Sequence, residues 1–60
     1  MKIAVLNYTT CEVDIITMTD EEAKAWDGGI DVYLEEVHGY KLRDIYYMAG
    51  ENINVNYLSK

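Results

Sequence analysis

The sequence has no proline, no phenylalanine and a single cysteine among its 60 residues. One cysteine excludes an intramolecular disulfide, and the chain has neither a CxxC motif nor a Cys/His set with zinc-binding spacing. A domain of this length buries only about 60% of the surface that its unfolded chain exposes. Without a disulfide or a metal, such a domain depends on close packing or on association, so we expect a homodimer.

Basic residues are scarce: five Lys and Arg stand against eleven Asp and Glu, which gives a formal net charge of −6 and a pI near 4.4. This charge opposes attraction to nucleic acid or to anionic lipid, so we expect direct binding to neither. No apolar run approaches the roughly 20 residues of a membrane-spanning helix. The first residues also lack the pattern of a signal peptide, and we expect a cytoplasmic location.

Motifs that bind cofactors or support catalysis are also absent. The chain has no Walker loop, GxGxxG, nucleophile elbow, HExxH or EF-hand loop, so we predict no cofactor, no metal and no catalytic residue. Cys11 lies in a predicted turn beside Glu12, whose charge disfavours the reactive thiolate. His38, the only histidine, lies at the end of a predicted helix, where it suits the helix dipole. Enzymatic use of Cys11 or His38 is therefore only a third hypothesis.

The acidic segment 19–39 is the one part of the chain with helical periodicity. It holds seven acidic residues against Lys24 and so carries the whole formal charge of the molecule. Thr19 and Glu22 form a capping-box motif that predicts a helix over 20–26. Two glycines inside a helix cost about 2 kcal/mol, so Gly28 and Gly29 predict a break before a main helix over 30–38 that Gly39 ends. One continuous helix is the alternative.

The remaining segments have strand patterns. Residues 2–8 and 13–18 predict a β-hairpin with a turn over 9–12, in which opposed positions sum to 21 and both faces carry apolar residues. Either something covers each face of this hairpin or one face meets another subunit. Residues 44–48 and the alternating segment 53–58 predict two further strands joined by a turn over 49–52. The expected fold is a single α+β domain over 1–60: ββαββ, with a four-stranded, mostly antiparallel sheet and the helical segment on one face.

Three stretches, KIAVLNYTTCEV, EEVHGY and DIYYM, resemble a group of short, acidic bacterial proteins. That group has a hydrophobic first strand, a turn of the Thr-Gly-Glu-Val kind and an acidic helix. The resemblance covers most of the chain and implies the ββαββ order, but it implies no activity. Cys11 stands where the group has glycine.

The carboxylates of the acidic segment are the main candidates for function. Asp27, Asp31 and Glu35 are four residues apart and would form a stripe on a continuous helix, with Glu36 beside it. The simplest interpretation is a solvated surface that keeps a small protein soluble. The functional hypothesis is a protein-interaction or regulatory module that docks an unknown protein partner on this acidic surface. The alternative is a DNA mimic that inhibits a nucleic-acid-binding protein.

One aromatic residue completes the predicted site. Tyr46 and Tyr47 are adjacent, so in a strand they point to opposite faces, and one of the two lies off the core. We select Tyr46 as the exposed aromatic, because exposed aromatic residues often anchor protein interfaces.

Overall fold

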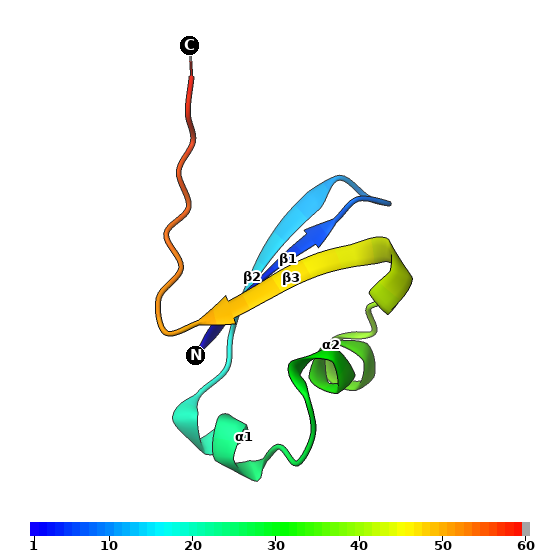
Figure 1. Ribbon diagram of the computed structural model, residues 1–60, viewed down its shortest axis with the longest axis vertical. Coiled ribbons are helices and arrows are strands. Elements are labelled where there is room, and N and C mark those ends of the chain that lie inside the picture. Colours follow the sequence, from blue (N-terminus) through cyan, green and yellow to red (C-terminus); the bar gives the residue numbers. More distant parts are fainter. Residues whose placement is uncertain (60) are drawn as a thin grey trace.

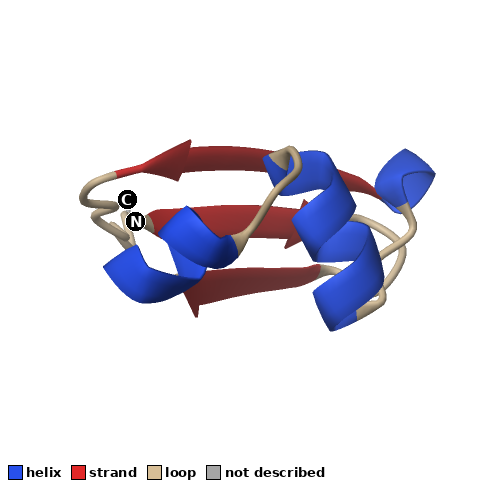
Figure 2. Cartoon of the chain, turned by 90° about the horizontal axis from the view of Figure 1, so that it is seen from below, coloured by secondary structure: helices blue, strands red, loops and turns tan. Residues whose placement is uncertain are grey.

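The computed structural model describes residues 1–59, which form one sheet and a layer of helices. The strands are β1 (Lys2–Asn7), β2 (Glu12–Thr17) and β3 (Ile45–Gly50). The helices are α1 (Asp20–Ala25), α2 (Ile30–His38) and the short 3-10 helix η1 (Leu42–Asp44). Figure 2 shows the helices spread over one face of the sheet.

The sheet is antiparallel with the order β2-β1-β3, so the first strand is central. The α+β class agrees with the sequence analysis, but the predicted four-stranded ββαββ sheet is wrong. Residues 53–58 are not a strand in the structure, and β3 pairs with β1 instead of with a following strand. In Figure 1 the segment after β3 runs away from the sheet, on the side opposite the helices.

The failed strand prediction has a physical reason. Alternation of Ile53, Val55 and Tyr57 indicates that one side of the segment is apolar, but it does not identify the surface that covers that side. The intervening Asn54 and Asn56 have low strand propensity. Tyr57 is 94% exposed, so nothing within the described chain buries the end of this segment.

The hairpin of β1 and β2 forms with a register two residues away from the predicted one. Ala4 lies opposite Ile15, and Asn7 lies opposite Glu12, so opposed positions sum to 19. The connecting turn begins at Tyr8, and the Asn7 side chain accepts hydrogen bonds from the backbone N–H groups of the two threonines that follow Tyr8. Because a shift of two residues preserves the side-chain period, the predicted division of residues between the two faces is still correct.

The two helices are separate, as the glycines predict, and the continuous-helix alternative is wrong. The Thr19 hydroxyl accepts from the Glu22 N–H at 3.1 Å, while the Glu22 carboxylate accepts from the Thr19 N–H at 3.2 Å. This capping box fixes the start of α1. Helix α2 ends at Gly39, whose φ of 75° is left-handed and favours glycine.

The core lies between the helices and the inner face of the sheet. It is small, as expected for this length, and consists of six buried residues: Ile3, Val5, Met18, Tyr33, Leu34 and Ile45. The central strand supplies the first two and α2 supplies Tyr33 and Leu34. Trp26 packs at the edge of this core, with its ring edge-on to Tyr33 at a centroid distance of 5.4 Å. The apolar side of the acidic segment therefore covers the sheet.

Candidate interaction surface

The opposite side of the sheet, which we call the outer face, has no helix over it in the described chain. Strand pairing sets its side chains in two rows. One row is Ile15, Ala4 and Met48, and the other is Val13, Leu6 and Tyr46. Five of the six are large and exposed: Leu6 51%, Val13 59%, Ile15 41%, Tyr46 71% and Met48 61%. Contiguous apolar surface of this kind marks an interaction site more often than a solvated face.

The outer face follows from the same hairpin that builds the core. In a strand, successive side chains point to opposite faces, and β1 is apolar at successive positions from Ile3 to Leu6. Ile3 and Val5 turn toward the helices and become fully buried, which leaves Leu6 on the other side. The helical layer can cover only one face, so the second apolar face remains open.

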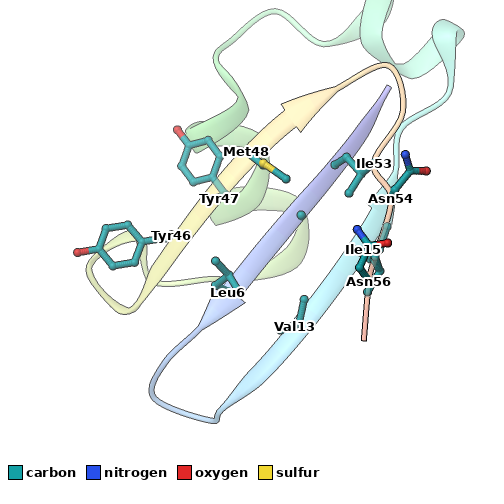
Figure 3. A pocket seen from close by; sticks show the side chains of 11 residues that line it. Leu6, Val13, Ile15, Tyr46, Tyr47, Met48, Ile53, Asn54 and Asn56 are labelled. Atoms are coloured by element: carbon teal, nitrogen blue, oxygen red, sulfur yellow. The ribbon is translucent and has the colours of Figure 1, made fainter. Parts of the chain in front are cut away.

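A groove of about 330 Å³ lies between the outer face and the segment that follows β3. Its sheet side is formed by the outer face with Tyr47, and its other side by residues 53–56. Figure 3 shows Ile53, Asn54 and Asn56 beside the sheet residues that line this groove. No side chain that lines it is charged, although the protein as a whole has a formal charge of −6.

The segment that borders the groove leaves the sheet progressively. Ile53 is half-buried, Val55 is 48% exposed, and Tyr57 and Leu58 are 94% and 92% exposed. Two large apolar side chains therefore project from the end of an extended segment. Sequence analysis missed this groove because it interpreted the alternation of residues 53–58 as a strand. The useful signal was the apolar character of both hairpin faces.

Tyr46, the one apolar residue of the predicted site, belongs to the outer face. Its ring lies against that of Tyr8, with centroids 5.6 Å apart and planes inclined by 43°. The Tyr8 hydroxyl donates a hydrogen bond to the Arg43 carbonyl, which ties the end of β1 to η1. Tyr46 is therefore an exposed aromatic that stands on a second aromatic ring, a suitable anchor for an interface.

The predicted acidic residues lie elsewhere, in the helical layer. Asp27 is exposed in the connection between α1 and α2, while Asp31, Glu35 and Glu36 are exposed on α2. Because Asp27 lies outside both helices, the predicted three-residue stripe is reduced to Asp31 and Glu35. The structure does not bring these carboxylates together with Tyr46. Both hypotheses for these carboxylates, a docking surface for a basic partner and a DNA mimic, remain predictions.

Cys11 and His38 lie in different surroundings. Cys11 is exposed in the hairpin turn with a φ of 58°, beside a shallow hollow of about 250 Å³. The residues that line this hollow are Leu6, Asn7, Tyr8, Cys11, Glu12 and Val13, and none of them can act as a general base of the histidine type. His38 ends α2, where its ring is 5.3 Å from that of Tyr33. His38 does not line this hollow, so the hollow does not pair the Cys11 thiol with a histidine that could activate it.

Two tyrosine hydroxyls donate to carboxylates, one from the segment after α2 to the sheet and one between the two helices. Tyr40 donates to the Asp14 carboxylate at 2.7 Å, and Tyr33 donates to the Glu22 carboxylate at 3.4 Å. Two effects raise the pKa of Tyr40 to about 12: burial, which is the larger, and the hydrogen bond to Asp14. Burial likewise raises the pKa of Tyr33. Hydrogen bonds with Thr19 lower the pKa of Glu22, and the bond from the Thr19 backbone N–H has the largest effect. Each of these groups has a structural role.

Comparison with protein-family models, with curated proteins and with solved structures gave no match. Within residues 1–59, no group of three or more His, Cys, Asp or Glu side chains is arranged to hold a metal ion. No helix in the same range has the length and apolar character needed to cross a bilayer. The groove and the outer face are therefore the features from which a function can be argued.

Proposed function

We propose that this protein is a small, non-enzymatic protein-interaction module that associates through the outer face of its sheet. The observation that carries the proposal is the row of exposed apolar side chains on β1, β2 and β3, opposite the helical layer. Monomeric proteins rarely leave contiguous apolar surface of several hundred Å² open to water. A thin core of six residues also favours association, because a domain of this size gains little from its own burial.

The distribution of charge supports self-association. The seven carboxylates of residues 19–39 belong to the helices and their connections, whereas the groove is lined by uncharged side chains. Two copies can therefore meet through their outer faces while both acidic layers point away from the contact. Contact through the helical layers would instead bring like charges together, which costs free energy.

The experiment compares two lysine substitutions at equally exposed apolar positions. Leu6 on the outer face is 51% exposed, and Val37 on α2 is 52% exposed. Leu6→Lys places a charge in the proposed interface, and Val37→Lys makes the same charge change in the helical layer. Sedimentation velocity should show a dimer for the natural chain and for Val37→Lys. The dissociation constant of the Leu6→Lys dimer should be at least about tenfold higher than that of the natural chain.

Circular dichroism must show that both variants keep the fold, so that dissociation is not a result of unfolding. A natural chain that sediments as a monomer up to high micromolar concentration would refute the proposed self-association. Equal weakening of the dimer by the two substitutions would show that the outer face is not the contact.

A further inference from the structure

We infer that the end of the segment 53–58, with Tyr57 and Leu58, lies in the groove of a second copy, and that the exchange is reciprocal. This inference rests on the proposed self-association and names its contact: the Tyr57 and Leu58 side chains of each chain pack on the outer face of the other. The occupant of the groove is a second copy of this chain.

The first argument is geometric. The segment is extended and leaves the sheet from the end of β3, on the side of the outer face (Figure 1). Ile53 and Val55 line the groove of their own chain, but Tyr57 and Leu58 have passed beyond it and are more than nine-tenths exposed. An apolar pair that projects past its own groove can be buried only by another molecule.

The second argument is complementarity between the groove and the segment. The groove is apolar, has no charged lining residue, and has a volume of about 330 Å³. That volume lies within the range of about 300–1,000 Å³ typical of sites that hold compact organic groups. An aromatic and an aliphatic side chain therefore suit it. Because the same chain carries both the groove and the projecting pair, a two-fold axis makes the contact self-complementary.

The third argument concerns the backbone. An extended segment that is buried alone leaves its N–H and C=O groups without partners, which is costly. When the two-fold axis is perpendicular to the segments and passes between them, the two segments 53–58 run antiparallel beside each other, and their backbone groups can pair. The side chains of Asn54 and Asn56 supply further hydrogen-bonding groups at the groove.

The fourth argument is the amount of apolar surface. Full burial of a large apolar side chain contributes about 2.5 kcal/mol, which at about 25 cal/mol per Å² corresponds to roughly 100 Å² of apolar surface. Nine exposed large apolar residues belong to the outer face, its rim or the projecting segment: Leu6, Tyr8, Val13, Ile15, Tyr46, Met48, Val55, Tyr57 and Leu58. Weighted by their exposed fractions, these side chains offer about 570 Å² by the same measure, which is most of the roughly 800 Å² that each partner contributes to a standard interface. The outer face without the segment offers less.

The test uses the full chain and a paired substitution with a matched control. Tyr57→Ser with Leu58→Ser removes the projecting pair, whereas Val32→Ser with Val37→Ser removes two exposed apolar side chains from α2. Sedimentation equilibrium should give a dissociation constant at least about tenfold higher for the first double variant, with little change for the second. Circular dichroism confirms that both remain folded.

A second measurement locates the contact directly. In a sample mixed from isotope-labelled and unlabelled chains, isotope-filtered NMR should show intermolecular contacts between the Tyr57 ring and the methyl groups of Leu6, Val13 and Ile15. A dimer that lacks these contacts, or that dissociates no more easily without Tyr57 and Leu58, overturns the exchange but leaves association through the outer face intact. A strict monomer overturns both.

Discussion

The Tyr40 hydroxyl donates a hydrogen bond to the Asp14 carboxylate at 2.7 Å, across 26 residues of sequence. This contact joins the segment after α2 to β2, an edge strand of the sheet. Both side chains are half-buried, and the bond is charge-assisted. It is therefore one of the few polar contacts that hold the helical layer to the sheet.

Removal of that hydroxyl should destabilise the fold. We expect Tyr40→Phe to lower the free energy of unfolding by about 1–2 kcal/mol, because the Asp14 carboxylate loses a donor while the ring is retained. Urea unfolding followed by circular dichroism measures the change. Thr10→Ala, which removes an exposed hydroxyl in the hairpin turn, is the control and should alter the free energy of unfolding by less than about 0.5 kcal/mol. Equal effects of the two substitutions would deny the bond a role in stability.

The same contact predicts a loss of stability at alkaline pH. The pKa of Tyr40 is raised from an ordinary value of 10.0 to about 12, so the folded state keeps its proton to higher pH than the unfolded state does. The resulting stabilisation is fully present below about pH 10 and is lost as the pH rises toward about 12. Urea unfolding at several alkaline pH values should therefore show a shallower decline for Tyr40→Phe than for the natural chain. The decline should not vanish, because the pKa of Tyr33 is raised as well.

The capping box of α1 predicts the effect of Thr19→Ala. Loss of the hydroxyl leaves the Glu22 N–H without its acceptor, and the free energy of unfolding should fall by about 0.5–2 kcal/mol. Thr19→Ser should retain most of the stability because serine supplies the same acceptor. Thr9→Ala, in the hairpin turn, is a control: only the backbone N–H of Thr9 takes part in the bond to Asn7, and alanine keeps that group. Thermal unfolding of the three variants checks this order.

The core predicts a large difference between two positions of α2. Leu34 is completely buried, and Leu34→Ala should cost about 2–5 kcal/mol. At about 0.05–0.15 kcal/mol per residue, a domain of this length has only about 3–9 kcal/mol of stability, so much of the variant should be unfolded at room temperature. Val37→Ala, at a half-exposed position of the same helix, should cost less than about 1 kcal/mol. One-dimensional proton NMR would distinguish the two, and a well-folded Leu34→Ala would contradict this description of the core.

Two carboxylates on α2 should have opposite effects on stability. Asp31 lies in the first turn, where negative charge is favourable, whereas Glu36 lies near the C-terminal end, where it is unfavourable. Asp31→Asn should lower the free energy of unfolding by about 0.3–1 kcal/mol, and Glu36→Gln should raise it by a similar amount. Urea unfolding at low ionic strength measures both changes. High salt should reduce both differences, and changes that persist there would indicate another cause.

Local interactions account for the features that the sequence alone determined. The capping box, the break at Gly28 and Gly29, and the left-handed end of α2 at Gly39 all depend on residues within six positions of one another. The division of β1 and β2 side chains between two faces follows from the strand period. Adjacency also predicted that one of Tyr46 and Tyr47 lies off the core, but it could not decide which; in the structure Tyr46 is 71% exposed and Tyr47 41%.

Tertiary structure decided the rest, because strand pairing joins residues that are far apart in the chain. β3 lies beside β1 across more than 30 residues, and within the described chain the segment 53–58 adds to neither edge of the sheet. The hairpin register depended on where the turn closes, at Asn7 and Glu12. The groove exists because the helical layer leaves one apolar face open and because residues 53–56 run past that face. Alternation in the sequence shows that a side chain is suited to burial, but only the fold shows whether its own chain can bury it.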